Sequence, residues 1–349
     1  MLKREDVVWA YRLCLDREPE SESVVQYWLG KVKSRRALVL SFLSSDEHTK
    51  NFGGGNSSPF WHYQSSFDAI EIINRHKKTG IHPSPSHVTN FLGVKIRPEF
   101  LSTTLSEQAG SVQPVPIPAN WHADIAEWAS CLRSLELSGK RFVMVEVGCG
   151  WGCWMNNLGV AAKSMRKEIK LYGIEADEGH LRFARDALRD NGIESDEFVL
   201  SRGIAGRAAS VALFPKIESG VNWGGAAIFQ PTIEQLKEAD ANEPKYVRIR
   251  VIDIDALIKD ERVVDLFHVD IQGAELELLS ETFDLLSMKI RYVFVGTHSK
   301  QIEGGLFDLF LRNSAWRLEM ERPAIFQLID GRPVLTVDGV QGWRNTAID

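Results

Sequence analysis

The strongest constraint on the fold is the segment between Arg141 and Asp177. Residues 142–147 form an apolar run that carries one acid, Glu146, and three alternate glycines follow at positions 148, 150 and 152. Because glycine has no Cβ, such a turn lets the backbone approach a ligand closely. A second apolar run ends at Glu175, 23 residues after Gly152. The segment predicts two parallel strands joined by a glycine turn and a helix, with a ligand at their carboxyl ends.

The glycine spacing distinguishes between two kinds of nucleotide-binding turn. A dinucleotide site needs G-x-G-x-x-G, but Cys153 stands at the third glycine position here. The pattern E-x-G-x-G-x-G instead resembles the first motif of class I methyltransferases, which bind S-adenosyl-L-methionine. An acid at the strand end suits the ammonium and sulfonium of that cofactor, and Glu175 could accept both ribose hydroxyls. The predicted cofactor-binding residues are Glu146, Gly148, Gly150, Gly152, Glu175, Ala176 and Asp270.

A second motif occupies residues 263–279, which read V-V-D-L-F-H-V-D-I-Q-G-A-E-L-E-L-L. It resembles the hallmark of FkbM-type methyltransferases, D-L-x-K-x-D-x-E-G-A-E-x-x-x-L, and residues 252–258 resemble the T-L-D-x-L segment that precedes it. The resemblance covers about residues 119–349 and implies methyl transfer to oxygen on sugars, glycolipids and other small natural products. His268 stands where that family usually has lysine, and Gln272 where glutamate is common. These two departures leave the substrate and any metal site open.

Strands and helices are expected to alternate from Arg141 onward, which predicts a parallel sheet covered on both faces. The fold class is therefore α/β, a class I methyltransferase (Rossmann-like) doubly wound sheet preceded by a small all-α module. One helix is expected at 67–76 and another at 123–137. The expected strands are 142–147, 170–174, 197–201, 266–270 and 292–295, with an inserted strand at 246–254 paired with 210–214.

The first 50 residues carry three apolar stripes at helical spacing, which predict three short helices. They resemble the small helical module of bacterial surface-glycan proteins that is related to phycobilisome linkers, through Tyr11-Arg12, residues 15–20, Tyr27-Trp28 and residues 42–47. The module either contacts a partner or only adds stability. Three glycines within 51–59 predict a flexible joint. The predicted domains are a helical module at 1–50, a joint and connecting segment at 51–118, and the methyltransferase domain at 119–349.

The catalytic residues are expected at the carboxyl ends of two strands. A sugar hydroxyl is a weak acid, so a base or a metal should accept its proton. Asp270 ends one expected strand and His298 follows the next, and neighbouring strands would bring the two together. We expect His298 to be the general base because imidazole titrates near neutral pH, with Asp270 as the second catalytic residue. The same two residues could hold a divalent cation instead, although two ligands are too few to claim a metal.

Other polar residues nearby have simpler explanations. Asp270 could cap the helix expected near Gly273, and His298 could be a loop histidine bonded to backbone. His268 is expected to be a core histidine, and Glu275 suits the first turn of a helix electrostatically. Two segments could contact the substrate: 116–124, which contains Trp121, and 222–225.

Composition excludes several classes of partner. A net charge of −6 gives no field that attracts nucleic acid or anionic lipid. Four scattered cysteines predict reduced thiols in the cytoplasm, and no apolar run is long enough to span a membrane. The predicted function is O-methylation of a sugar hydroxyl on a glycan, glycolipid or glycosylated metabolite. The alternatives are a catalytically silent cofactor-binding scaffold in glycan assembly and, disfavoured by Cys153, a nicotinamide-dependent oxidoreductase.

Overall fold

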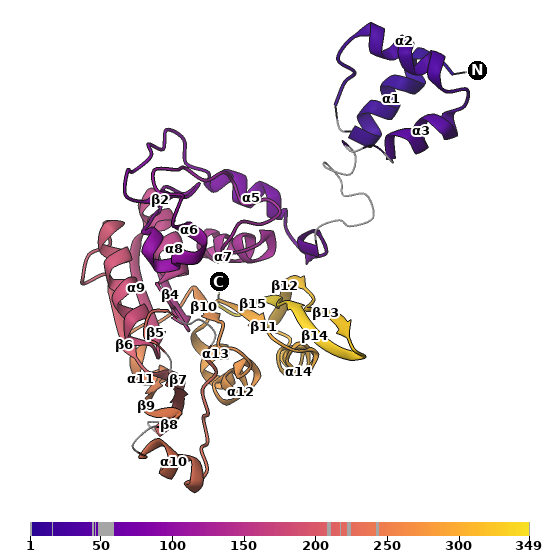
Figure 1. The fold of residues 1–349 in the computed structure, drawn as a ribbon. Helices are drawn as coiled ribbons and strands as arrows, with labels where there is room; N and C mark the ends of the chain where they lie inside the picture. The colour runs from indigo at the N-terminus through magenta and orange to yellow at the C-terminus, as the bar shows by residue number, and fades with distance from the viewer. Residues whose placement is uncertain are drawn as a thin grey trace. The chain divides into compact units, whose positions relative to one another are not determined.

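The chain forms two compact units, Met1–His62 and Tyr63–Asp349, in the computed structural model (Figure 1). The structure describes residues 2–15, 17–43, 45, 47, 59–207, 211–216, 218–221, 225–241 and 244–348. The glycine joint predicted at 51–59 lies outside the described residues except for Pro59.

The first unit contains the three predicted helices: α1 (Arg4–Leu15), α2 (Glu22–Lys31) and α3 (Arg35–Leu43). Their apolar stripes meet in one small core that includes Val7, Val25, Leu38 and Phe42. The rings of Tyr11 and Phe42 pack edge to face with their centroids 4.8 Å apart. The resemblance of this unit to phycobilisome linkers stays a prediction.

The second unit is built on an eight-stranded sheet with the order β1-β12-β15-β11-β10-β4-β5-β6. The five predicted strands of the sheet are confirmed and run parallel to one another, whereas β15, β12 and β1 continue the sheet in antiparallel pairs. The strands are β1 (Gln64–Ser65), β4 (Arg141–Val147), β5 (Glu168–Glu175), β6 (Phe198–Arg202), β10 (Leu266–Val269), β11 (Tyr292–Thr297), β12 (Trp316–Arg322) and β15 (Gly339–Asn345).

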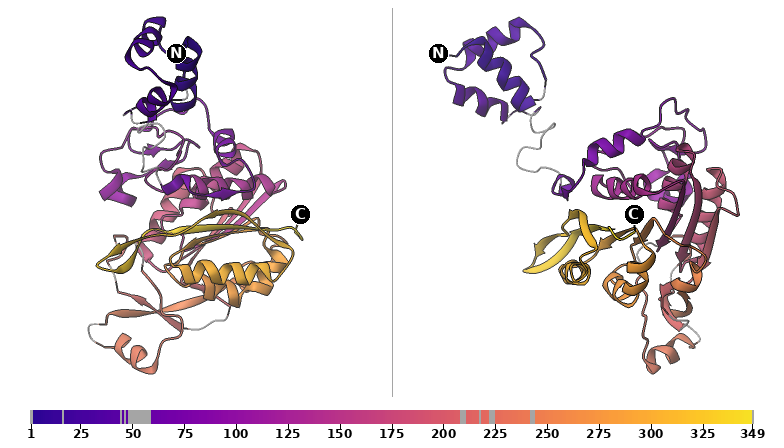
Figure 2. Two further views of the ribbon diagram at one scale, coloured as in Figure 1. Left: turned by 90° about the vertical axis from the view of Figure 1, so that its right-hand side faces the viewer. Right: turned by 180° about the vertical axis from the view of Figure 1, so that it is seen from behind.

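Helices cover both faces of this sheet because successive strand residues point to opposite sides. Phe142 and Met144 of β4 enter one core with helices of the first layer, and Val143 and Val145 enter the other core with the second layer. The first layer holds α5 (Ala69–His76), α7 (Ile125–Leu137), α8 (Cys153–Ser164) and α9 (Glu178–Asp190); the second holds α12 (Glu275–Glu281), α13 (Phe283–Lys289) and α14 (Lys300–Leu311) (Figure 2). The mostly parallel, doubly covered sheet confirms the predicted fold class.

Residues 63–118, which we assigned to a connecting segment, pack into the first core. They contribute Ile73, Val88, Phe91 and Phe100, all with no more than 3% of their surface exposed. Their remaining elements are short: β2 (Val88–Thr89), β3 (Lys95–Ile96), η2 (Pro98–Leu101) and α6 (Ser102–Leu105).

Two excursions leave the main sheet. The insertion after β6 forms a three-stranded sheet of order β7-β9-β8, and β8 pairs antiparallel with β9 as predicted. Its elements are β7 (Ile204–Gly206), β8 (Val211–Pro215), α10 (Ile233–Ala239), β9 (Tyr246–Asp253) and α11 (Ile254–Leu257). A hairpin of β13 (Ile325–Ile329) and β14 (Arg332–Val337) separates β12 from β15. Among the described residues, no helix has the length and apolarity to cross a membrane.

Candidate functional site

The glycine turn joins β4 to α8 in a conformation that requires glycine. Gly148, Gly150 and Gly152 have φ angles of 76°, 53° and 73°, in the left-handed region that side chains disfavour. A Cβ on Gly148 would lie 2.3 Å from the carbonyl oxygen of Asp270. The N–H groups of Gly148 and Cys149 donate to the carbonyl of Ile174 at 2.9 and 3.1 Å, which fastens the turn to β5.

Glu146 connects the end of β4 to the first turn of α8. Its carboxylate is buried and accepts hydrogen bonds from the backbone N–H groups of Trp154 at 3.1 Å and Met155 at 2.9 Å. Burial raises the pKa of Glu146 to about 8, against the effect of these two donors. The side chain does not line the neighbouring cavity, so Glu146 satisfies the first N–H groups of α8 and positions the glycine turn.

A cavity opens where the carboxyl ends of β4, β5 and β10 meet the insertion. Five of the seven residues predicted to bind the cofactor line it, whereas Glu146 and Gly152 do not; the five are Gly148, Gly150, Glu175, Ala176 and Asp270. The insertion supplies an apolar wall that sequence reasoning missed, formed by Ile204, Phe214, Ala227 and Phe229.

Glu175 presents a fixed carboxylate to this cavity. One oxygen accepts from the N–H of Gly150 at 2.9 Å and the other from the N–H of Asp177 at 2.8 Å. Burial raises the pKa of Glu175. Each oxygen has two lone pairs, so both can accept a further hydrogen bond from a ligand.

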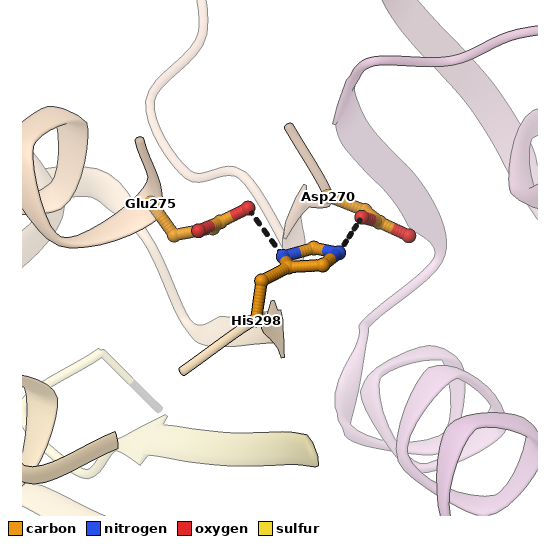
Figure 3. A group of neighbouring side chains, drawn as sticks. All are labelled: Asp270, Glu275 and His298. Atoms are coloured by element: carbon orange, nitrogen blue, oxygen red, sulfur yellow. Dashed lines mark ion pairs between the residues drawn. The ribbon is translucent and has the colours of Figure 1, made fainter. Parts of the chain in front are cut away.

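Asp270, Glu275 and His298 form one cluster of side chains (Figure 3). The imidazole lies between the two carboxylates: Nε2 is 3.4 Å from Asp270 Oδ1, and Nδ1 is 2.9 Å from Glu275 Oε1. The side chain of Asp270 is 46% exposed, that of Glu275 is 0% exposed and that of His298 is 11% exposed. Asp270 is therefore the open member, and it is the one that lines the cavity.

The cluster changes the protonation of its members. Desolvation by the protein atoms crowded around Asp270 raises the pKa of its carboxyl to about 6, although one side stays open to the cavity. Burial alone would lower the pKa of His298, but the ion-pair contact with Glu275 and the charge of Asp270 outweigh it and raise the pKa to about 9. The ring therefore holds its proton more tightly than a free imidazole does, because it sits between two acids.

Comparison with known proteins identifies the second unit. A family model described as the methyltransferase FkbM domain matches residues 127–313. A Jannaschia sp. (strain CCS1) protein named as a methyltransferase is 42% identical over 267 residues, which cover 76% of this chain and 95% of that protein. This chain belongs to the FkbM methyltransferase family.

Solved structures similar to this FkbM protein include two methyltransferases. The methyltransferase FkbM from Methylobacillus flagellatus KT aligns with a TM-score of 0.39 and 13% identity, over 62% of this chain and 54% of that one. The METTL16 MTase domain aligns with a TM-score of 0.38 and 14% identity, over 78% of this chain and 88% of that one.

The structure also bears on other interpretations made from the sequence of this FkbM domain. His268 is buried against Trp154 and Phe294, and among the described residues its Nδ1 has no hydrogen-bond partner. Trp121 lies in the segment before α7, near the ring of Trp151, and donates to Gln113 Oε1 at 3.0 Å. Asp270 does not cap α12, which begins after Ala274. The proposed substrate loop at 222–225 falls outside the described residues except for Gly225.

Glu275 is the site residue that sequence reasoning missed. We explained it by its place in the first helical turn, and its Oε1 does accept from the N–H groups of Ile271 at 3.1 Å and Gly273 at 3.0 Å. The same oxygen faces His298. Despite burial, which acts in the opposite direction, the contact with His298 lowers the pKa of Glu275. Its place in the motif, five residues after Asp270, was the available signal.

Proposed function

We propose that this protein transfers a methyl group from S-adenosylmethionine to a hydroxyl of a saccharide, carried by a glycan, a glycolipid or a glycosylated metabolite. The family supplies the methyl transfer. The choice of a saccharide rests on the resemblance described above. The observation that supports a hydroxyl acceptor is the position of Asp270, whose open carboxylate lines the same cavity as the glycine turn and Glu175.

The cavity fits this cofactor. Gly148 and Gly150 leave the backbone bare where a methionine moiety would lie, and Glu175 offers two acceptors to a ribose. Phe214 and Phe229 on the insertion offer apolar contact to a purine. When bound, S-adenosylmethionine would supply an electrophilic methyl group on a positively charged sulfur.

Asp270 suits the role of proton acceptor better than His298, which we favoured from the sequence. Imidazole with a pKa of about 9 keeps its proton at neutral pH and cannot take another. Asp270 is also the residue that an acceptor in the cavity could reach, because His298 is only 11% exposed. In this proposal the Asp270 carboxylate takes the proton of the acceptor hydroxyl, and His298 and Glu275 hold Asp270 in place.

A divalent cation could instead promote the loss of the proton from the acceptor hydroxyl. One ligand atom from each of Asp270, Glu275 and His298 lies within 4.8 Å of the others. Two carboxylates and an imidazole are ligands that cations such as Mn²⁺ accept, and a bound cation would lower the pKa of the acceptor hydroxyl.

The test is methyl transfer itself. Purified protein is incubated with methyl-labelled S-adenosylmethionine and a panel of oligosaccharides, glycolipids and glycosides, and the label in the acceptor is counted. Transfer to a hydroxyl supports the proposal, and NMR of the intact methylated product identifies the position. Tight cofactor binding without transfer to any acceptor would favour the catalytically silent scaffold instead.

The partner contact predicted for residues 1–50 stays a prediction. Trp9 and Leu13 lie one helical turn apart on α1 and are 55% and 74% exposed, so they are the apolar side chains that such a partner would cover.

A further inference from the structure

The β13–β14 hairpin leaves the sheet beside the candidate site. β15 pairs antiparallel with β11, and Gly339 lies opposite Thr297, the residue before His298. β12 ends at Arg322, opposite Val340. The chain therefore departs into the hairpin and returns from it at the carboxyl edge of β11, the edge that holds the cluster (Figure 1).

The base of the hairpin is fastened to the loop that carries His298. Glu303 of α14 accepts from the backbone N–H of Ala324, just before β13, and from the hydroxyl of Thr297 at 3.3 Å. The same side chain pairs with Lys300 at 2.7 Å. The hairpin consequently has a fixed origin relative to the site.

One face of the hairpin is wholly apolar. Phe326 pairs with Leu335 and Leu328 pairs with Pro333, and residues two apart on a strand share a face. The opposite face is mixed, with Gln327, Ile329, Arg332 and Val334. Leu328 is 78% exposed, and none of the four apolar residues belongs to a buried core of the described chain.

An isolated two-stranded hairpin is marginally stable in water, and apolar side chains exposed on one face mark a binding surface. Leu328 and Pro333 are the exposed members of this face, whereas Phe326 and Leu335 are half-buried at its inner part. The inner end of this face lies at the start of α14, where Lys300 Nζ is 5.9 Å from the centre of the Phe326 ring and Lys300 is two residues after His298. From Phe326 the face continues outward by about 7 Å to Leu328, at about 3.4 Å per residue.

Resting on the methyl transfer proposed above, we propose that this face binds the hydrocarbon portion of an amphiphilic acceptor, whose hydroxyl lies at Asp270. Continuity with the cluster favours this occupant. A membrane is less suited, because residues 325–337 carry one cation, Arg332, and one anion, Asp330, and so have no net attraction for anionic lipid. A second copy is less suited because a stable dimer buries about 800 Å² on each subunit, more than four side chains offer.

The test compares two probes with the same sugar, methyl β-glucoside and octyl β-glucoside below its micellar concentration. Binding is measured by ligand-observed NMR in the presence of S-adenosylhomocysteine. Each buried methylene strengthens binding by roughly fourfold, so the octyl probe should bind the wild-type protein at least about tenfold more tightly. The double variant Leu328→Ser/Leu335→Ser should lose this preference, and Ile329→Ser on the opposite face should keep it.

Several outcomes would overturn the inference. They are equal binding of the two probes to the wild type, or loss of the preference in both variants alike. Conversion of a dimer to a monomer by the double variant, seen in sedimentation, would assign the face to a second copy. Cosedimentation with phosphatidylcholine vesicles that only the double variant loses would assign it to a membrane. S-adenosylhomocysteine affinity, measured on the same samples, tests the cofactor site separately and also reports that each variant is folded.

Discussion

At the scale of single residues, the site combines groups that bind a ligand with groups that hold the binding groups. Glu175 does both, because its two oxygens fix the N–H groups of Gly150 and Asp177 while they face the cavity. Glu146 and Glu275 position the binding groups, because each is buried and accepts hydrogen bonds from backbone N–H groups. Asp270 is the exposed acid that remains free for chemistry.

Glu175→Ala should weaken binding of S-adenosylmethionine by about 2–3 kcal/mol, because two charge-assisted hydrogen bonds to the ribose are lost. Titration calorimetry measures the change. Glu178→Ala, at an exposed position three residues later, is the matched control and should bind as the wild type does. Unchanged affinity in a folded Glu175→Ala protein would remove this residue from the cofactor site.

Asp270→Asn should lower turnover by roughly 10²–10⁴-fold, because an amide cannot accept the proton of the hydroxyl. His298→Ala should also lower turnover but leave cofactor affinity nearly unchanged, since its side chain does not line the cavity. Single-turnover transfer is measured with and without a chelator, and Glu281→Gln at the exposed end of α12 is the control. If a chelator abolishes wild-type activity and a divalent ion restores it, a cation held by Asp270, Glu275 and His298 takes the place of the base in the mechanism.

His122, in the segment before α7, should make the protein sensitive to acid. Burial lowers the pKa of its ring to about 4, whereas the unfolded chain titrates near 6.5. The folded state therefore binds fewer protons than the unfolded state. The contribution of His122 to the free energy of unfolding is complete above about pH 6.5 and is lost as the pH falls toward 4. Between pH 6.5 and 5 the wild type should lose about 2 kcal/mol more free energy of unfolding than His122→Gln.

Urea unfolding at several pH values measures this difference, and replacement of the exposed His82 by glutamine is the control. Parallel pH dependence of the wild type and His122→Gln would show that the ring can take up a proton without cost to the fold.

At the scale of elements, apolar runs bounded by turns predicted the five parallel strands, because strands buried on both faces read as continuous apolar segments. The strands at the antiparallel side were not predicted. β12 alternates apolar and charged residues in W-R-L-E-M-E-R and is only partly buried. The core role of residues 63–118 was missed as well, because Phe91 and Phe100 lie in loops and short turns without a helical or strand period.

The glycine turn is the element on which the cofactor site depends most. Gly148→Ala places a Cβ 2.3 Å from a backbone carbonyl oxygen and forces a positive φ on alanine. We therefore expect the free energy of unfolding to fall by about 1–3 kcal/mol, and cofactor affinity to fall as well. Gly139→Ala has no atom within 4 Å of its new Cβ and should change stability by less than about 0.5 kcal/mol. Denaturant midpoints and calorimetry compare the two, and a Gly148→Ala protein that binds as the wild type does would contradict this account of the turn.

At the scale of the whole molecule, the structure divides the chain after His62, whereas the sequence placed the start of the methyltransferase domain at residue 119. The two boundaries make different predictions about which shortened chains fold. A chain that begins at Ser58 keeps every residue of the first core of the second unit, including Ile73, Phe91 and Phe100. It should fold and bind S-adenosylmethionine with the affinity of the full chain.

A chain that begins at Ala119 lacks those side chains, each at most 1% exposed in the full protein. Removal of even one buried phenylalanine costs about 3–5 kcal/mol, and a domain has only about 5–15 kcal/mol in total, so this shorter chain should be unfolded or insoluble. Circular dichroism and cofactor calorimetry on the two chains decide between the boundaries. If the chain from Ala119 folds and binds cofactor, residues 63–118 are a dispensable cover; if the chain from Ser58 fails, the three-helix unit contributes to the stability of the second unit.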